Sequence, residues 1–227
     1  IAAALLTAVS PAMAGARLSG AGASFPSKIY TRWFADLSKE KEGLKVNYQA
    51  VGSGSGRKAF LDETVDFGAS DDPMKDKDIA KAKRGLVQIP MTGGTIAFGY
   101  NMPGCDLKLT QEQAVQVAIG EINNWSQVGC DDQKMTWVAR SDGSGTTAAF
   151  TRSLNEFSNK WKLGVAKSVA WPTGVAAKGN AGVAGMIKQT PGAIGYVNQS
   201  YIKGKVRAAS LQNLSGEFLK PSVEAGA

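Results

Sequence analysis

Short apolar segments with the two-residue period of a strand alternate along this 227-residue chain with segments that have the period of a helix. Residues 44–52, LKVNYQAVG, place apolar side chains on one face and predict a strand. After Pro26, apolar residues recur at i, i+3, i+4 and i+7, which predicts an amphipathic helix. We find no internal repeat, and turn residues separate the segments. The pattern predicts an α/β fold with a layer of helices on a sheet.

Further elements follow the same alternation. Residues 65–70 and 135–140 predict strands, and residues 146–157 predict a helix with an apolar stripe. A capping-box pattern at 110–113 predicts a helix through Ala118. Residues 85–101 predict two strands broken at Pro90 and at Gly93-Gly94, where the chain could pass between two lobes. The tandem Trp33-Phe34 could offer a stacking platform for bases, but its helical spacing favours a core position.

The charge and the missing histidines limit the classes of function. The chain has 26 Lys and Arg against 19 Asp and Glu, a net charge of +7, and no histidine. The excess favours anionic partners, although a solvated basic surface explains it equally well because the charges are spread along the chain. Without a basic stripe, nucleic-acid binding is not expected. Without imidazole, Ser-His and Cys-His nucleophile pairs and His-ligated zinc are excluded, and lysine or carboxylate chemistry is what remains for catalysis. We therefore expect no enzyme and no metal site.

Residues 1–14, IAAALLTAVSPAMA, are apolar and end in the small-x-small pattern that signal peptidase reads. We interpret them as the remnant of a secretory signal peptide, which is too short to span a bilayer. The mature protein would begin near Gly15 in an oxidising, periplasmic compartment. There Cys105 and Cys130 could form one disulfide, and two separate buried thiols are the alternative.

Three polar turns share one design: GAGASF, GSGSG and DGSGTT each combine glycine with hydroxyl residues just before a predicted helix. Glycine allows close approach of a ligand to the backbone, and a helix start offers unpaired N–H groups to an anion. In open α/β sheets such turns gather beyond the carboxyl ends of the strands. Each turn alone is weak evidence, because ordinary helix capping explains it better. Together they predict an anion site.

The charged residues near these turns refine the type of anion. Arg140 can donate to two oxygens of a tetrahedral anion, and Asp142 can brace it. Asp71 has the wrong charge for an anion pocket unless the anion carries a proton. Phosphate at neutral pH still has an O–H to donate to a carboxylate, whereas sulfate has none. The residues therefore favour inorganic phosphate.

The motifs GAGASFP, VNYQAVGSGSG, TVDFGASDDP, RSDGSGTT, KGNAGVAG and PGAIGYV stand in one order over residues 20–203. In this order they resemble the periplasmic phosphate-binding proteins of the phosphate ABC transporter. The resemblance implies a type II periplasmic binding protein fold, with two α/β lobes and a ligand cleft between them. It also implies high-affinity phosphate binding in the periplasm, delivery to the permease subunits of the transporter in the membrane, a monomer, and no cofactor.

The resemblance assigns roles residue by residue. The hydroxyl of Ser53 and the carboxylate of Asp71 would contact phosphate, with Asp71 accepting its proton. Asp142 would support the cation that touches the ligand. The full phosphate-binding set implied is Ser24, Phe25, Ser53, Asp71, Arg140, Ser144, Gly145 and Thr146.

The resemblance also predicts how the chain divides. Residues 15–91 would form lobe I and residues 92–227 lobe II. Family members continue beyond the region that matches GEFLKPSVEAGA and return to complete the first lobe, so we expect a C-terminally truncated chain with an incomplete lobe I. The parent protein would then bind phosphate, and this fragment would bind it weakly or be unstable.

One alternative from another class is a secreted phosphatase-like enzyme on the same scaffold. It would need a nucleophile with a base, or a pair of metal ions, and the sequence offers no histidine or clustered carboxylates for either. A dinucleotide-binding interpretation of residues 54–59 lacks the acidic residue that should follow.

Overall fold

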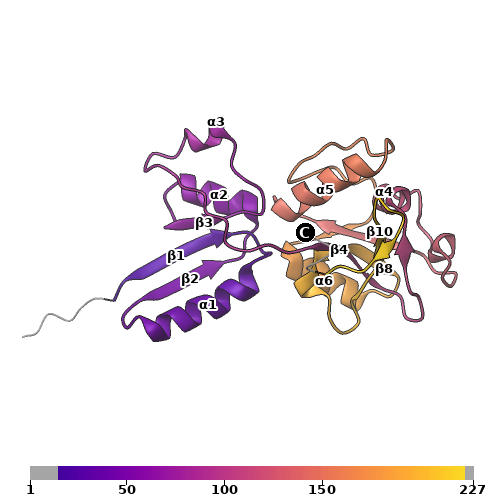
Figure 1. Ribbon diagram of the computed structural model, residues 1–227, viewed down its shortest axis with the longest axis horizontal. Coiled ribbons are helices and arrows are strands. Elements are labelled where there is room, and N and C mark those ends of the chain that lie inside the picture. The colour runs from indigo at the N-terminus through magenta and orange to yellow at the C-terminus, as the bar shows by residue number, and fades with distance from the viewer. Residues whose placement is uncertain (1–14, 223–227) are drawn as a thin grey trace, which may run out of the picture.

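The computed structural model describes residues 15–222, and its strands form three sheets, two of three strands and one of five. Figure 1 shows two bodies: one three-stranded sheet with its helices at the left, and the other two sheets at the right. We call these lobe I (residues 15–79) and lobe II (residues 96–222). Residues 80–95, which contain the predicted boundary between 91 and 92, hold no strand or helix. The boundary itself and residues 1–14 as a signal remnant stay predictions, and the latter lie outside the described residues.

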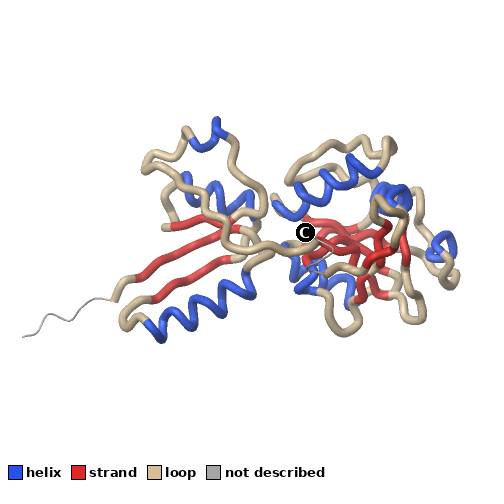
Figure 2. The backbone as a smooth tube through the Cα atoms, in the orientation of Figure 1, coloured by secondary structure: helices blue, strands red, loops and turns tan. Residues whose placement is uncertain are grey.

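Lobe I is a parallel sheet with a helix on each face. Strand β1 pairs in parallel with β2 on one side and with β3 on the other, so both connections cross over through a helix. The first crossover runs from β1 to β2, and the second runs back from β2 past β1 to β3. Because they run in opposite directions across the sheet, α1 and α2 lie on opposite faces, as Figure 2 shows. The elements are β1 (Arg17–Gly22), α1 (Ser27–Glu40), β2 (Lys45–Gln49), α2 (Ser53–Leu61), β3 (Phe67–Ala69) and α3 (Asp76–Ile79).

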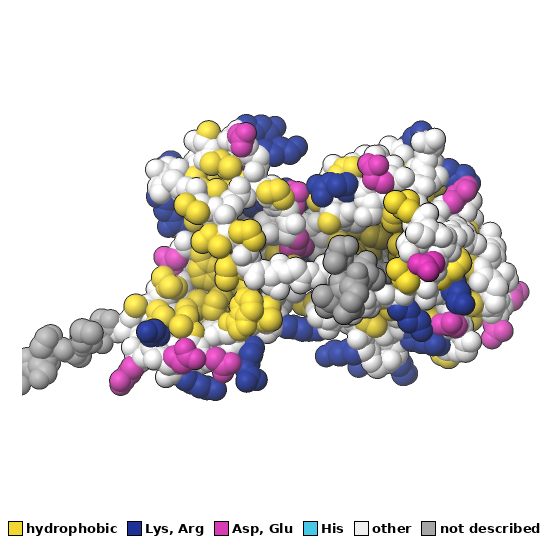
Figure 3. Space-filling view, in the orientation of Figure 1, with side chains coloured by type: hydrophobic (Ala, Val, Ile, Leu, Met, Phe, Trp, Pro, Cys, Tyr) yellow, Lys and Arg dark blue, Asp and Glu magenta, His cyan; other side chains and the backbone are white. Residues whose placement is uncertain are grey.

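The apolar side chains of lobe I are only partly buried. An aromatic cluster of Tyr30, Phe34, Tyr48 and Phe67 joins α1 to the sheet, with ring centroids 5.2–6.5 Å apart. Trp33 is 38% exposed, so its predicted core position is wrong. Trp33 stays exposed because α1 is the only helix on its face of a three-stranded sheet, so few neighbouring side chains can cover the indole ring. Figure 3 shows hydrophobic side chains gathered on this lobe over β1, β2 and α1.

Lobe II is built around a mixed sheet. Strand β6 lies between the parallel neighbours β7 and β8, and β4 pairs antiparallel with β8 and β9. A small second sheet joins β5, β10 and β11. The elements are β4 (Ile96–Asn101), β5 (Lys108–Leu109), α4 (Gln111–Ile119), β6 (Thr136–Arg140), α5 (Gly145–Phe157), β7 (Val175–Ala177), α6 (Gly179–Gln189), β8 (Ala193–Asn198), β9 (Arg207–Ala208), β10 (Ser210–Gln212), β11 (Phe218–Leu219), and the 3-10 turns Trp125–Val128 and Gln199–Tyr201.

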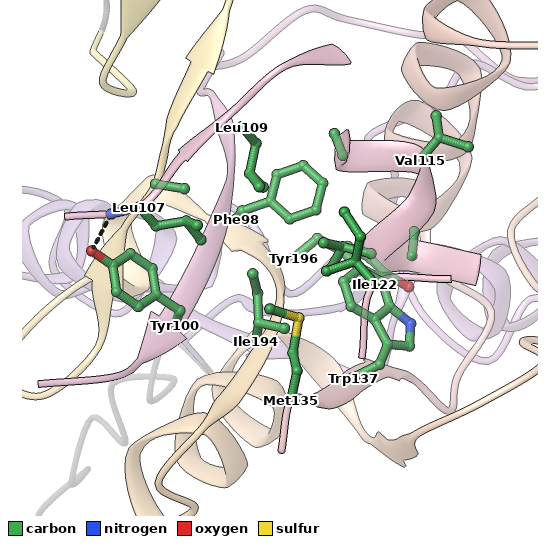
Figure 4. Close-up of a cluster of buried hydrophobic side chains, with 14 of the residues drawn as sticks. Phe98, Tyr100, Leu107, Leu109, Val115, Ile122, Met135, Trp137, Ile194 and Tyr196 are labelled. Carbon is green, nitrogen blue, oxygen red and sulfur yellow. Dashed lines mark hydrogen bonds between the residues drawn. The ribbon is translucent and has the colours of Figure 1, made fainter. Parts of the chain in front are cut away.

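Two clusters of buried hydrophobic side chains stabilise lobe II, one on each face of its sheet. The larger packs α4 and α5 against β4, β6 and β8, and the smaller packs α6 against the same sheet. Figure 4 shows part of the larger cluster around Phe98, Trp137 and Tyr196, and the bond in which Leu107 N donates to the Tyr100 hydroxyl at 3.2 Å. Both clusters lie within residues 96–211. Lobe II is therefore a well-packed body.

Cys105 and Cys130 form a disulfide in the larger cluster, with 5.5 Å between their Cα atoms. The bond joins the loop after β4 to the loop after the turn Trp125–Val128. It closes 25 positions of chain within lobe II.

Most predicted elements are confirmed, including the capping box of α4, where Thr110 Oγ1 accepts from Gln113 N at 3.1 Å. Two of the predicted elements are wrong. Residues 85–95 form no strand, because no neighbouring strand pairs with them and Val87 and Ile89 are exposed. The GSGSG stretch is not a turn before a helix, because α2 begins at Ser53 inside it. No helix in residues 15–222 is long and apolar enough to cross a membrane.

Candidate functional site

Five chain segments meet between the lobes, each just after a parallel strand. Three are the helix starts of α2, α5 and α6, and the other two follow β1 and β3. The backbone comes closest at Gly54, whose N–H donates to Gly143 O at 2.8 Å. A Cβ atom built on Gly145 would lie 2.6 Å from Ser53 Oγ and 2.8 Å from Asp71 Cβ, so only glycine fits there. The carboxyl ends of the strands in both lobes thus face one another, as expected for a ligand site of this fold class.

Asp71 lies at the centre of this contact. Its Oδ2 accepts from Thr146 Oγ1 at 2.8 Å, its Oδ1 lies 3.5 Å from Ser53 Oγ, and its N–H donates to the same hydroxyl at 3.3 Å. Burial raises the pKa of Asp71, although the hydrogen bond from Thr146 and the charge of Arg140 act to lower it. A ligand that donates a hydrogen bond to Asp71 would therefore stabilise its buried carboxylate.

Arg140 ends strand β6 and is held by Asp142. Arg140 Nε and Nη2 donate to the two carboxylate oxygens of Asp142 at 2.7 and 2.6 Å, and the two side chains are only 2% and 9% exposed. Burial acts to raise the pKa of Asp142, but the hydrogen bonds from Arg140 and Gly179 N keep it below its usual value. Arg140 Nη1 is buried and has no hydrogen-bond partner among the described residues. A buried guanidinium N–H without an acceptor is costly, so this atom is suited to an anionic oxygen.

Helix α5 begins beside Arg140 with hydroxyl residues. Ser144 is its N-cap, and Ser144 Oγ accepts from Thr147 N at 3.0 Å. Gly145 and Thr146 form the first turn, in which backbone N–H groups have no carbonyl acceptor within the helix. The positive end of the helix dipole adds to this donor set. All three residues are buried.

Ser24 and Phe25 approach from lobe I. Ser24 is 5% exposed, and its Oγ accepts from the backbone N and the side-chain Nδ2 of Asn180, both at 3.0 Å. Phe25 is half-buried, and its ring lies against the crossing segment, where a Cβ on Gly94 would be 2.7 Å away. Phe25 can therefore offer the site only its backbone.

The structure brings the predicted residues together in one place. Ser53, Asp71, Gly145 and Thr146 touch directly, and Asp142 lies against Gly52 at the start of α2. Ser24 is linked to Thr146 through Asn180. Their roles toward a ligand stay predictions.

Sequence reasoning missed two buried polar residues. Asn180 at the start of α6 links both lobes through Ser24 and Thr146. The Tyr196 hydroxyl accepts from Arg140 N at 3.2 Å and pairs with Thr147 Oγ1 at 2.7 Å. Burial raises the pKa of Tyr196 to about 12. Both residues stand in the motifs KGNAGVAG and PGAIGYV, but a single polar residue in an apolar helix or strand gives no sign of its partner.

The site presents many hydrogen-bond donors and one carboxylate acceptor not committed to a cation. Within residues 15–222 no group of three or more His, Cys, Asp or Glu side chains is arranged to hold a metal ion. Such a donor set suits a tetrahedral oxyanion, and the free carboxylate suits one that carries a proton.

Comparison with known proteins gives a consistent result. The profile of the PBP superfamily domain matches residues 8–225. "Phosphate-binding protein PstS" of Pasteurella multocida is 42% identical over 91% of this chain and 64% of its own length. The protein of the same name from Haemophilus influenzae is 42% identical over 91% of this chain and 66% of its own length. The chain thus spans less than two thirds of the length of these relatives.

Solved structures share the fold. A high-affinity periplasmic phosphate-binding protein, PfluDING, bound with phosphate, aligns with a TM-score of 0.78 and 23% identity, covering 92% of this chain and 66% of that one. A putative phosphate ABC transporter substrate-binding protein from Clostridium perfringens with bound phosphate aligns with a TM-score of 0.74 and 20% identity, covering 93% of this chain and 88% of that one. At these identities the alignments establish the fold.

Proposed function

The chain belongs to the PBP superfamily, and from that premise we propose that it binds inorganic phosphate between its two lobes. The ligand-contacting residues are Ser24, the backbone of Phe25, Ser53, Asp71, Arg140, Ser144, Gly145 and Thr146, with Asp142 supporting Arg140. The names of the relatives and the phosphate bound in the similar structures support this proposal.

One observation carries the proposal: a buried arginine is fixed by a carboxylate but keeps one unpaired nitrogen. Asp142 takes two of the three guanidinium nitrogens of Arg140, and Nη1 has no partner among the described residues. The charges of Arg140 and Asp142 cancel, so the site attracts an anion through directed N–H groups rather than through net charge. A phosphate oxygen would satisfy Nη1 and the amides of the α5 first turn together.

Asp71 supplies selectivity. Hydrogen phosphate can donate its O–H to the carboxylate, whereas sulfate would place a lone pair against it. A contact between two like charges costs several kcal/mol. Burial raises the pKa of Asp71 even though Thr146 donates to its carboxylate, so an O–H donated by phosphate would stabilise this buried charge further.

Binding would serve transport. We propose that the protein acts in the periplasm as a monomer and delivers phosphate to the permease of an ABC transporter. The permease would recognise the closed conformation, in which the two lobes surround the ligand. A phosphatase-like activity is less favoured, because the sequence has no histidine to act as a base and no group of side chains within residues 15–222 is arranged to hold a metal ion.

Titration calorimetry with phosphate and with sulfate tests the proposal. Phosphate should bind at least about a hundredfold more tightly than sulfate, because sulfate incurs the repulsion at Asp71. Equal binding of the two anions, or heat from neither, would contradict the proposal. A chromogenic phosphoester incubated with the same sample should not be hydrolysed.

A further inference from the structure

Asn180 is completely buried at the start of α6 and contacts both lobes. The preceding Gly179 has a positive φ of 68°, and its N–H donates to Asp142 Oδ1 at 2.9 Å. The carboxylate that holds Arg140 therefore also fixes the first turn of α6. Asn180 is placed by the same group that positions the cation of the site.

The orientation of the Asn180 amide follows from its neighbours. Asn198 N donates to one side-chain atom at 2.8 Å, and because a backbone N–H can only donate, that atom is Oδ1. The NH2 group then faces the hydroxyls of Ser24 at 3.0 Å and Thr146 at 3.4 Å. One amide thus serves one hydroxyl from each lobe.

The consequence for Ser24 is a fixed proton direction. A hydroxyl has one proton and two lone pairs, and Ser24 Oγ already accepts from the N and the Nδ2 of Asn180. Its own proton must therefore be donated. We propose that Asn180 is a positioning residue that makes Ser24 an obligate donor toward the bound anion, an inference that rests on the proposed phosphate site.

This arrangement also explains why Asp71 can discriminate. If Ser24 could turn and accept, it would satisfy a phosphate proton in place of Asp71. With Ser24 held as a donor and Arg140 able only to donate, Asp71 remains the natural acceptor for the ligand O–H. Asn180 thereby acts on selectivity without touching the ligand.

A double-mutant cycle between Asn180→Ala and Ser24→Ala tests this role by phosphate titration. Each single variant should lose about 10- to 100-fold in phosphate affinity, the range of one hydrogen bond to a charged group. The double variant should lose little more than either single one, because Asn180 acts through Ser24. Additive losses, or an unchanged Asn180→Ala, would overturn the inference.

The controls separate this inference from the proposed function and from misfolding. Asn155→Ala removes an exposed asparagine of α5 and should bind phosphate like the parent chain. A parent chain that binds no phosphate refutes the proposed function, whereas a binding parent with additive variants refutes only the role of Asn180. If Asn180→Ala does not unfold cooperatively, Asn180→Ser, which is polar but too short to reach both hydroxyls, replaces it in the cycle.

A second, independent observation concerns Asp72, which pairs with cations of both lobes. Across the lobe interface, Lys167 Nζ lies 3.0 Å from Oδ2 and Arg152 Nη2 3.4 Å from Oδ1. On its own lobe, Arg57 Nη2 lies 3.1 Å from Oδ2 and also donates to the backbone oxygens of Asp72 and Pro73. The side chains of Asp72, Arg57 and Lys167 are only 17%, 14% and 27% exposed, which limits solvent screening.

We infer that Asp72 is a latch that stabilises the closed arrangement of the lobes. Arg57 fixes the loop within lobe I, and the pairs with Lys167 and Arg152 exist only while the lobes are together. A contact present in one conformation shifts the population toward it. The latch should therefore slow phosphate release without any contact with phosphate, again provided that the site binds phosphate as proposed.

Stopped-flow measurement of phosphate release tests the latch. Asp72→Asn should release phosphate about 3- to 10-fold faster at low salt, and added salt should accelerate release by the parent chain more than by the variant. The variant should fold, because Arg57 keeps its bonds to backbone oxygens. Asp36→Asn, which removes an ion pair of 2.7 Å within α1, is the matched control and should release phosphate at the parent rate. Equal release rates for Asp72→Asn and the parent would overturn the latch.

Discussion

The two lobes contribute similar elements to the site but rest on very different packing. In lobe II, both buried hydrophobic clusters and a disulfide lie behind strand β6, which presents Arg140, and helix α5, which presents Thr146. In lobe I, the buried apolar residues are few, namely Ala21, Ala23, Tyr30 and Met74, and the aromatic cluster is half-covered. A parallel strand followed by a helix start is thus enough to place a hydrogen-bond donor. How rigidly the donor is held depends on the hydrophobic core behind that helix. We expect lobe II to be the stable partner, onto which lobe I closes.

The largest expected effect is the loss of the cation that lobe II supplies. Arg140→Met should abolish measurable phosphate binding, because it removes the charge and leaves Asp142 buried without its partner. Breaking a buried ion pair in this way costs about 3–5 kcal/mol. Calorimetry measures the affinity, and Arg32→Met, at an exposed arginine of lobe I, is the control. Retained phosphate affinity in Arg140→Met would show that lobe II does not supply the dominant attraction.

A matched pair of phenylalanines compares the two cores directly. Phe150 is 5% exposed and stacks on Tyr196 at 4.3 Å, whereas Phe34 is half-buried and contacts Tyr30 at 5.4 Å. Phe150→Ala should lower the free energy of unfolding by about 3–5 kcal/mol, and Phe34→Ala by less than about 2 kcal/mol. Denaturant titration of both variants measures the difference. Similar losses would mean that lobe I is packed as well as lobe II.

The disulfide should stabilise lobe II alone. Replacing Cys105 and Cys130 together by serine should cost about 3–4 kcal/mol, the value that the loop-entropy argument gives for a closed loop of this size. Hydrogen exchange should then quicken in β4 and α4 and stay unchanged in β1 and β2. Faster exchange in both lobes would indicate that they unfold as one unit.

The smallest expected effect on stability concerns Asp71 of lobe I. Burial raises its folded pKa, so its contribution to stability is greatest at low pH and is lost as the pH rises through that raised pKa. Lowering the pH from neutral toward the ordinary aspartate range should stabilise the parent chain relative to Asp71→Asn, as measured by thermal unfolding. In Asp71→Asn, the ratio of phosphate affinity to sulfate affinity should be smaller than in the parent chain. Parallel pH profiles would show that Asp71 does not titrate as inferred.

Much of the fold could be predicted from the sequence, because local patterns determine it. The resemblance to the phosphate-binding proteins and the α/β type II fold are confirmed by the family match and the similar structures. The predicted strand in residues 85–95 is wrong, because a strand needs a neighbour that no local pattern reveals. The predicted core position of Trp33 is wrong for a related reason: its helix has an apolar stripe, but the sheet behind the helix is too narrow to cover that stripe.

The site was predictable where glycine and hydroxyl residues cluster in one segment. DGSGTT and GSGSG predicted anion-binding turns next to helices, and the structure places the starts of α5 and α2, which lie inside these two stretches, face to face. The roles of Asn180 and Asp72 could not be predicted, because each depends on partners from distant parts of the chain. Ser24 lies 156 positions from Asn180, and Lys167 lies 95 positions (167 − 72) from Asp72. Only the closing of the two lobes brings these pairs together.

Because Gly145 has no side chain, substitutions at this position can be used to change how closely the two lobes approach each other. Because a methyl group there would strike Ser53 and Asp71, the lobes can meet only as closely as this glycine permits. Alanine at this position would retain every predicted ligand-contacting residue but would strain the closed form at Ser53 and Asp71. If the site binds phosphate as proposed, a set of small substitutions at this residue should give phosphate sensors with graded operating ranges from one scaffold.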